Sequence, residues 1–517
     1  MLTLIFTTAR EAKICPKIVK FFIRSSDVAE AISHAACETD TNVLLASRRS
    51  PSCRGNIYSY RVHFVGEESL NQPKEKTRYT LAILFAVNLL NFYDRAIFGA
   101  VAEPIRKEWA LSDSQIGWLA TAFTLLYALI GVPLGRLADR WNRPRLLGIG
   151  VAAWSILTAA SGIAWSYGSL FVARLGVGVG EAACAPAANS LIGDLYPAAR
   201  RARALALFML GLPFGNFLGT FISGHVAAAY GWRMAFYIAC VPGLFLATPA
   251  MNVLDPPRGA TESAPLAGRA KQGSPYWAVL RIPSIRWIII TGALFNANMY
   301  AIATFLPAYL SRYHLLDLKQ SNTTAAILLG LSGVLGILLG GWAADRVSTI
   351  RTNGRLLVCV ATAFLMAFCI YLALNLPTGQ VILFVALMGT GCVAAYVYYS
   401  AVYAAIQDVV PPSLRGTAMA LYFLAMYLLG GSFGPVLIGK LSDHFARSAM
   451  SAAGASTLNE HFRAVGLHSA MYAIPASIVL LVAALLGAAR VVSRDMKELQ
   501  VWMSSPEGQP PVVEARK

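Results

Sequence analysis

The chain has 517 residues, of which 56% are hydrophobic and 13% are charged, and its mean hydropathy is +0.56. So few charges cannot cover the surface of a soluble protein of this length, which excludes an ordinary soluble protein and indicates one that crosses a membrane several times. The formal net charge of +17 does not indicate nucleic-acid binding, because the arginines and lysines are scattered over short segments between apolar runs.

The N-terminal part of the chain differs in composition from everything that follows. Residues 1–77 are polar and mixed in charge, and their first apolar run, Met1 to Thr7, is too short for a signal peptide. We therefore expect a disordered N-terminal extension that ends where the apolar part of the chain begins.

Twelve apolar runs follow, each long enough for the roughly 20 residues of a membrane-crossing helix. They cover approximately residues 79–102, 114–138, 145–165, 167–192, 203–230, 232–253, 284–311, 322–344, 355–375, 380–409, 415–442 and 465–489. The sequence predicts an all-α membrane protein divided into a six-helix bundle at 78–253, a central loop at 254–283, a second six-helix bundle at 284–490 and a tail at 491–517.

The positive charges between the runs indicate how the chain is inserted. Arginine and lysine favour alternate connections, namely 2–3, 4–5, 6–7, 8–9 and 10–11, and also the C-terminal tail, whereas connections 3–4 and 9–10 carry none. Loops rich in arginine and lysine stay in the cytoplasm. We therefore expect an integral protein of the cell or inner membrane, with both termini and the central loop in the cytoplasm.

The second six runs repeat motifs of the first six. Asp194-Leu-Tyr-Pro after run 4 returns as Asp408-Val-Val-Pro after run 10, at an offset of 214 residues. Gly135-x-x-x-Asp after run 2 likewise returns as Gly341-x-x-x-Asp after run 8, at an offset of 206. This duplication predicts two structurally related halves.

Runs 1 and 4 carry charged side chains well inside the span, where charge is costly and indicates a functional site by default: Asp94 and Arg95 in run 1, and Arg174 and Glu181 in run 4. At 1.5 Å per residue, Asp94 and Arg174 both lie roughly 10–12 Å from the outer end of their runs, so we expect them to pair. Glu181 lies nearer mid-span without an expected partner, so its carboxyl group would be protonated part of the time. The alternative is a static ion pair that only holds the first bundle together.

Run 10 adds Tyr396, Tyr399 and Tyr403 at helical spacing, in mid-span rather than at the interfacial belts where tyrosine usually lies. Their hydroxyl groups need partners, which indicates either the lining of a cavity or aromatic packing against a neighbouring helix. The place in run 7 that matches Asp94 reads Asn296-Ala-Asn298 and carries no charge, so the duplicated scaffold does not require one there.

The connection between runs 2 and 3 is crowded with cations. Residues 135–147 resemble the G-x-x-x-D-R-x-G-R-R/K signature of the major facilitator superfamily. Asn142 stands where that family has glycine, and asparagine also tolerates a left-handed turn. The resemblance implies a conformational latch between the two halves, formed by Gly135, Asp139, Arg140, Arg143 and Arg145.

Three further motifs resemble the spinster-like branch of that superfamily: Asp94-Arg, Gly178-Val-Gly-Glu-Ala and Asp194-Leu-Tyr-Pro. The resemblance implies that helices 1, 4, 7 and 10 line a central cavity around Asp94, Arg174, Glu181, Asn298 and Tyr399. Relatives in this branch move lysophospholipids and sphingolipid phosphates, and the bacterial ones are thought to couple transport to protons.

We therefore expect a secondary transporter that works by alternating access and moves an amphipathic anionic lipid with protons. Arg95 or Arg174 would attract the anionic headgroup, with Asn298 and the three tyrosines of run 10 as further binding residues, and Asp94 and Glu181 would carry the proton. One alternative is a proton symporter for small organic anions, which needs the same arginine but no opening for acyl chains. Another is a non-transporting membrane receptor, which would tolerate loss of the carboxylates.

No enzyme is predicted. The stretch from Gly178 to Ala183 fits a loose dinucleotide-binding pattern but lies inside an apolar run rather than after a strand, and the chain contains no Walker A loop, H-E-x-x-H or nucleophile elbow. The cysteines form no C-x-x-C pair, so neither a zinc site nor a disulfide framework is indicated. We expect no cofactor and no metal, and a monomer whose partners are the substrate, protons and the bilayer.

Overall fold

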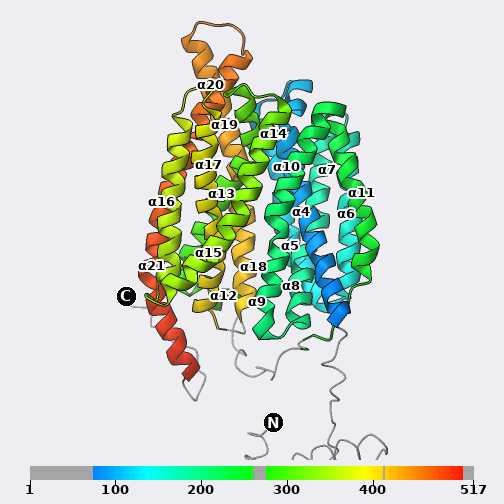
Figure 1. The fold of residues 1–517 in the computed structure, drawn as a ribbon, viewed down its shortest axis with the longest axis vertical. Coiled ribbons are helices and arrows are strands. Elements are labelled where there is room, and N and C mark those ends of the chain that lie inside the picture. Colours follow the sequence, from blue (N-terminus) through cyan, green and yellow to red (C-terminus); the bar gives the residue numbers. More distant parts are fainter. Residues whose placement is uncertain (1–73, 259, 261–274, 412–413, 505–517) are drawn as a thin grey trace, which may run out of the picture. The chain divides into compact units, whose positions relative to one another are not determined.

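A computed structural model describes residues 74–504 apart from 259, 261–274 and 412–413. Within these ranges every regular element is helical, and twelve helical spans are long and apolar enough to cross a membrane (Figure 1). The predicted all-α membrane architecture is therefore confirmed. The expected N-terminal extension lies almost wholly outside the described residues, as do much of the central loop and the end of the tail.

The first half supplies six of these spans, two of which are interrupted. Its helices are α4 (Lys74–Glu108), α5 (Asp113–Arg140), α6 (Arg143–Ile163), α7 (Tyr167–Glu181) followed by α8 (Cys184–Leu195), α9 (Ala198–Met209) followed by α10 (Gly211–Tyr230), and α11 (Trp232–Met251).

The second half begins with a short helix, α12 (Pro275–Leu280), and supplies the other six spans. These are α13 (Pro283–Arg312), α14 (Leu318–Ala326) continued by the π-helix η2 (Ile327–Leu331) and α15 (Ser332–Ser348), α16 (Gly354–Leu374), α17 (Val381–Val409), α18 (Arg415–Ala425) continued by the π-helix η4 (Met426–Gly431) and α19 (Phe433–Ala452), and α20 (Glu460–Met471) followed by α21 (Ala473–Ser504).

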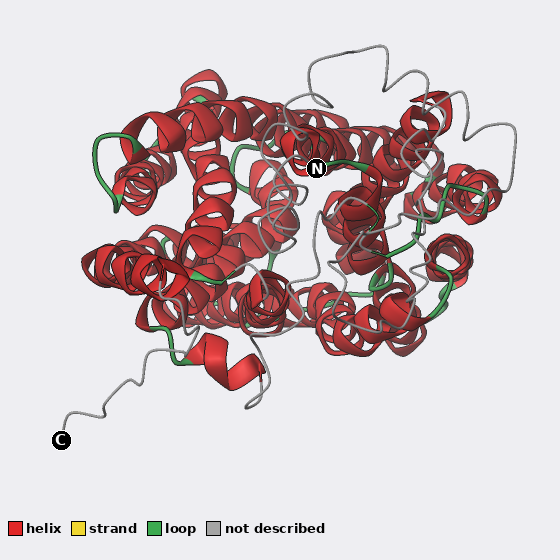
Figure 2. Ribbon diagram, turned by 90° about the horizontal axis from the view of Figure 1, so that it is seen from below, coloured by secondary structure: helices red, strands yellow, loops and turns green. Residues whose placement is uncertain are grey.

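The two halves lie side by side, the first on the right in Figure 1 and the second on the left, and Figure 2 views them from below. We call the end where α5 leads into α6 through Trp141 and Asn142 the arginine-loop end, and the end where α4 leads into α5 the opposite end. Both α4 and α13, the first long helix of each half, run from the arginine-loop end to the opposite end.

Polar residues fix where several helices begin. Ser112 caps α5, since its hydroxyl accepts the N–H of Gln115 while the Gln115 side chain accepts the N–H of Ser112. Asn142 caps α6 by accepting the N–H of Arg145 at 2.8 Å. The φ angle of Asn142 is −68°, so the expected left-handed turn is wrong. Asparagine serves here as an N-cap instead.

At the opposite end the two halves are packed closely, and glycines at their boundary leave no space for a side chain. A Cβ on Gly117 of α5 would lie 2.6 Å from the carbonyl oxygen of Pro435 in α19. A Cβ on Gly224 of α10 would lie 2.2 Å from the Cβ of Asn322 in α14. Side chains at these glycines would push the halves apart, so this end is closed in the structure.

Candidate functional site

Two charged residues of the first half, Arg95 and Glu181, meet where α7 ends. The span Tyr167–Leu195 is interrupted after Glu181, because Pro186 has no N–H to donate to the carbonyl group of Ala182. Irregular backbone at membrane depth is tolerated only where protein or a water-filled cavity surrounds it. The break therefore places the Glu181 side chain inside the bundle at the end of a helix.

Glu181 is fully buried and is held by two side chains of α4. Arg95 donates from Nε to Oε2 of Glu181 at 2.9 Å, and Asn91 donates from Nδ2 to the same oxygen at 2.9 Å. The other carboxylate oxygen, Oε1, has no hydrogen-bond partner. The expectation that Glu181 lacks a partner is thus wrong, although one of its oxygens remains free to bind a proton.

Arg95 joins the two halves at this centre. Its guanidinium group donates to the hydroxyl of Tyr300 in α13 at 3.4 Å and to that of Tyr427 in η4 at 3.3 Å. The guanidinium carbon also lies 4.3 Å from the ring centroid of Tyr127 in α5. A change at Glu181 therefore acts on a side chain that touches both halves.

Asp94 and Arg174 do not form the expected ion pair. Thr158 of α6 donates to Oδ2 of Asp94 at 3.5 Å, and Oδ1 has no partner. Arg174 lies against the rings of Phe98 and Phe123, with its guanidinium carbon 5.4 and 5.3 Å from their centroids, and its Nε has no partner. The expectation failed because depth in the membrane does not fix the direction in which a side chain leaves its helix.

We call the group formed by Asp94, Arg95, Arg174 and Glu181 the charged centre. It contains two carboxylates and two guanidinium groups, so its formal charges cancel. Protonation of either carboxylate leaves one excess positive charge in a buried setting, which attracts an anion. A bound metal cation would meet both guanidinium groups, and among the described residues no three His, Cys, Asp or Glu side chains lie close enough to hold one. The arrangement suits proton exchange together with anion binding.

The three tyrosines of α17 have different surroundings. Tyr396 is buried and donates its hydroxyl to the carbonyl group of Leu329 at 2.7 Å, which fixes it against η2. Tyr399 and Tyr403 are half-buried, and their ring centroids lie 5.9 Å apart. Tyr396 is therefore a packing residue, whereas Tyr399 and Tyr403 keep hydroxyl groups available for another molecule.

Asn298 faces α21 rather than the charged centre, since its Oδ1 accepts the hydroxyl of Ser477 at 2.6 Å. Asn296 instead donates to the carbonyl oxygen of Met426 at 2.9 Å, at the start of η4, and its own Oδ1 has no partner. The next residue of η4 bonds to Arg95. The structure thus places Asn296, rather than Asn298, beside the centre, and π-helical turns are frequent at functional sites.

Of the five residues expected to form a latch, Arg143 has a structural role in the first half. It is completely buried, donates from Nε to Asp255 at 2.7 Å, and also pairs with Asp194. In the second half Arg355 pairs with Asp408 in the same way. The motifs that repeat in the sequence therefore make equivalent contacts in the two halves.

The other expected latch residues are not engaged in this structure. Asp139, Arg140 and Arg145 are exposed, and within the described ranges their side chains form no hydrogen bond or ion pair. A Cβ on Gly135 would lie 3.8 Å from the side chain of Pro186, an ordinary contact distance. Among the described residues these side chains therefore form no hydrogen bond or ion pair between the halves, and the bond at this end is instead the one that Arg136 of α5 donates to the hydroxyl of Tyr276 in α12 at 3.3 Å.

We expect Arg143→Gln to lower the thermal stability more than Arg355→Gln does. Removal of Arg143 leaves two carboxylates without their buried cation, a loss of about 3 kcal/mol. The Arg355 side chain is 22% exposed, so water screens its partners and the loss is about 1 kcal/mol. Melting of both purified variants in the same detergent checks this order. Equal losses would mean that the burial of Arg143 adds nothing.

A charged network at the opposite end, buried except for Glu460, was not recognised in the sequence. Arg312 of α13 donates to Glu103 at 2.7 Å and to Asp113 at 2.8 Å. Arg106 donates to Glu103 at 2.7 Å and to Glu460 at 2.7 Å. Since Arg312 and Glu460 belong to the second half and the other three residues to the first, the network holds the halves together.

The network was not recognised because hydropathy makes the predicted spans shorter than the helices. The expected runs stop or start one residue away from Glu103, Asp113 and Arg312, which made all three look like loop charges. The helices themselves extend far enough to include them. Two acidic residues and one arginine, placed at the end of run 1, the start of run 2 and the end of run 7, lie on the same side of the membrane, and this was the signal that could have revealed the network.

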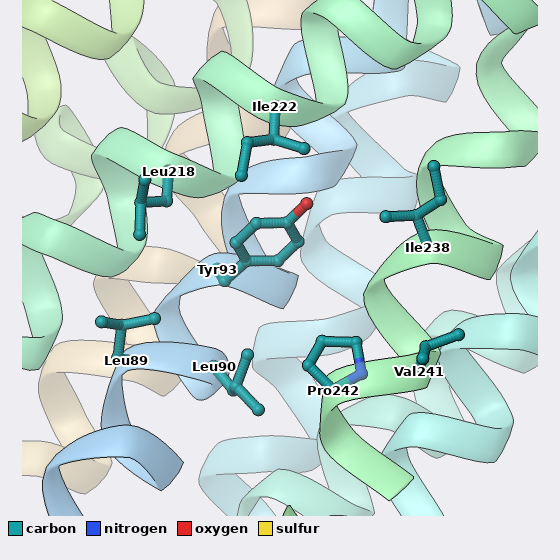
Figure 3. Close-up of a pocket in the computed structure, with 8 residues that line it drawn as sticks. All are labelled: Leu89, Leu90, Tyr93, Leu218, Ile222, Ile238, Val241 and Pro242. Atoms are coloured by element: carbon teal, nitrogen blue, oxygen red, sulfur yellow. The ribbon is translucent and has the colours of Figure 1, made fainter. Parts of the chain in front are cut away.

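An apolar pocket of about 500 Å³ opens on the surface of the first half between α4, α10 and α11 (Figure 3). It is lined by Leu89, Leu90, Tyr93, Leu218, Ile222, Ile238, Val241 and Pro242. Tyr93 and Arg95 leave α4 on nearly opposite sides, because a helix turns by about 100° per residue. The pocket is therefore separate from the charged centre, and its aliphatic lining suits a surface that faces lipid.

Residues 84–435 match the family described as Major Facilitator Superfamily. An MFS-type efflux pump of Mycolicibacterium smegmatis is 31% identical over 370 residues, which cover 70% of this chain and 84% of that protein. Protein spinster homolog 3 of Mus musculus is 30% identical over 397 residues, which cover 72% of this chain and 76% of that protein.

One solved structure is similar to this chain over nearly its whole own length. It is a bacterial homolog to the human lysosomal transporter Spinster, in an inward-facing and unoccupied conformation. The TM-score is 0.73 at 25% sequence identity, with 82% of this chain and 99% of that chain covered. A D-xylose-proton symporter shares the fold, with a TM-score of 0.63 at 17% identity.

Proposed function

The chain belongs to the Major Facilitator Superfamily, in its spinster-like branch, and from that membership we propose a secondary active transporter that couples its substrate to protons. The observation that carries the proposal is the bond between Arg95 and Glu181. Because Arg95 also touches two tyrosines of the second half, the protonation state of Glu181 would control a contact between the halves.

Protonation of Glu181 removes its charge and weakens its hydrogen bond with Arg95. The guanidinium group then has an unbalanced positive charge, with which it binds an anion between the two halves. When the site opens on the other side, Glu181 releases its proton and binds Arg95 again, which displaces the anion. In this scheme proton and anion bind together, so the geometry favours symport.

We propose an amphipathic anionic lipid, such as a lysophospholipid or a sphingolipid phosphate, as the substrate. Arg174 is 3% exposed and has an unpartnered Nε, so it offers a second cation to a phosphate group. The half-buried aromatic rings of Tyr399 and Tyr403 offer surface to an acyl chain. A small organic anion would use the same guanidinium groups and no apolar surface, and a non-transporting receptor would not need Glu181.

Transport by the purified protein in proteoliposomes separates these possibilities. The probes are a labelled lysophospholipid with an anionic headgroup and labelled succinate, each with and without a pH gradient. We expect the lipid to accumulate and the gradient to drive it. Accumulation of succinate alone would favour the organic-anion symporter, and movement of neither probe would favour the receptor. One relative is named an efflux pump, so both membrane orientations need to be assayed.

We further propose that the arginine-loop end lies in the cytoplasm, together with the start of α4 and the end of α21. The dense arginines of the loop between α5 and α6 support this orientation. The closed opposite end would then face away from the cytoplasm. That state corresponds to the inward-facing conformation named for the solved bacterial relative.

Asp139 is the residue we expect to close the arginine-loop end in the other state. Because Asp139 has no hydrogen-bond or ion-pair partner among the residues that the structure describes, Asp139→Asn removes no such contact here and weakens only the state in which that end is shut. We expect turnover to fall about fivefold or more, with substrate affinity nearly unchanged. Turnover and binding measured on the same purified variant check this. Unchanged turnover would leave the motif as a signal of topology only.

A further inference from the structure

Asp443 of α19 caps the N-terminus of α5 across the boundary between the halves. Its Oδ1 accepts the N–H of Asp113 at 3.0 Å, and its Oδ2 accepts the N–H of Ser114 at 2.9 Å as well as the Ser114 hydroxyl. A carboxylate in this place satisfies N–H groups that have no partner within the helix and meets the positive end of the helix dipole. The second half thereby holds the first turn of a helix of the first half.

The surroundings of Asp443 are built for close approach. A Cβ on Gly439, one turn earlier in α19, would lie 2.3 Å from the carbonyl oxygen of Asp113. Ser442 donates to Oδ2 of Asp113 at 2.6 Å, and Arg312 donates to the same oxygen at 2.8 Å. The cap is therefore continuous with the buried charged network at the opposite end.

Gly439 and Asp443 have the same spacing as Gly135 and Asp139, which lie at the other end of α5. The span formed by α18, η4 and α19 packs against α5 and runs in the opposite direction. Each of these two spans thus carries Gly-x-x-x-Asp in its C-terminal half, and because the spans run in opposite directions, the N-terminus of each lies at the same end of the bundle as the aspartate of the other. Among the described residues no side chain caps the start of α18, where Leu414 is the N-cap residue, so a carboxylate would satisfy N–H groups there.

One of these two contacts is made in the structure and the other is open. Asp443 is 7% exposed and bonded to α5, whereas Asp139 is exposed and has no bonded partner in the described part of the chain. We propose that Asp443 is a second latch, which alternates with the one described above for Asp139. Asp443 caps α5 while the opposite end is closed, and Asp139 caps α18 while the arginine-loop end is closed. The inference rests on the alternating access proposed above, and it adds Asp443 as a positioning residue for that cycle.

Distances between spin labels on the full-length protein in nanodiscs test the proposal, after replacement of the native cysteines. Labels at the exposed positions Trp165 and Lys319 report on the opposite end, and labels at Arg203 and Ile350 report on the arginine-loop end. Asp443→Asn keeps the shape of the side chain and removes its charge. We expect it to change the ratio of the two states about tenfold in favour of an open opposite end.

Asp139→Asn is expected to shift the same ratio in the other direction, and the double variant to return it to near the wild-type value. Lys440→Gln is the matched control, because it changes an exposed charge on α19 next to these residues, and it should shift nothing. Reversal in the double variant is a result that a purely structural role of Asp443 would not produce.

The proposal is overturned if Asp443→Asn lowers the melting temperature and leaves both distance distributions unchanged, or if both aspartate variants shift them in the same direction. The measurement uses neither substrate nor a pH gradient. A wrong substrate class or the lack of proton coupling would therefore appear in the transport assays, while the distances would still report on the latches.

Discussion

Arg95→Gln is expected to abolish transport and to lower thermal stability. Glu181 would remain fully buried without its cation, and breaking one side of a buried ion pair costs about 3–5 kcal/mol. The variant also loses the bonds by which position 95 reaches the second half. We expect the transport rate in proteoliposomes to fall more than about a hundredfold, as a loss of this size implies. Transport near the wild-type rate would remove Arg95 from the mechanism.

Two further variants separate the charge of Arg95 from its shape. Arg95→Lys keeps the charge and lacks the planar guanidinium group, so it should preserve stability better than transport. Arg95→Gln combined with Glu181→Gln leaves no unpaired charge in this pair. We expect the double variant to regain much of the melting temperature and none of the transport. Recovery of transport together with stability would mean that the pair only holds the bundle together.

Glu181→Gln alone is expected to separate substrate exchange from accumulation driven by a pH gradient. Glutamine cannot take or release a proton, so it mimics a carboxyl group that stays protonated. It also leaves Arg95 free to bind an anion. Exchange of labelled for unlabelled substrate should therefore continue, while accumulation against a concentration gradient is lost. Full accumulation in this variant would show that Glu181 carries no coupled proton.

Asp94→Asn is the matched comparison for Glu181→Gln. Since Asp94 forms no ion pair in the structure, neutralising it should leave the melting temperature near the wild-type value. If Asp94 were paired with Arg174, the same substitution would instead lower the melting temperature. If Asp94 shares the proton, its variant accumulates less substrate in response to the gradient. If the Asp94→Asn variant accumulates as much substrate as the wild-type protein, Glu181 rather than Asp94 carries the proton.

The fold follows from features that are local in the sequence. Apolar runs of sufficient length determine the spans, and the duplicated motifs around Asp194 and Asp408 determine the two related halves. The pairing of these aspartates with Arg143 and Arg355 makes the duplication visible as equivalent contacts. Such features need no knowledge of how helices rotate against each other.

The contacts at the centre depend on helix rotation and on breaks in helices, which the sequence does not display. Asp94 and Arg95 are neighbours, yet they point to different elements because each step along α4 turns by about 100°. The partner of Glu181 was not predicted because it depends on the end of α7 at this residue and on how α4 is rotated against it. The choice between Asn298 and Asn296 likewise depended on η4, a π-helical turn without a recognised sequence signal.

Proton movement caused by the substrate itself is the most direct test of the central claim, that protonation of Glu181 is coupled to anion binding at Arg95. Proteoliposomes are loaded with a pH-sensitive dye, held without a pH gradient, and exposed to an inward gradient of an anionic lysophospholipid. The account predicts acidification of the lumen by the wild-type protein and none by Glu181→Gln, even though this variant still exchanges the lipid. Lipid uptake without acidification in the wild type, or equal acidification in both proteins, would contradict it.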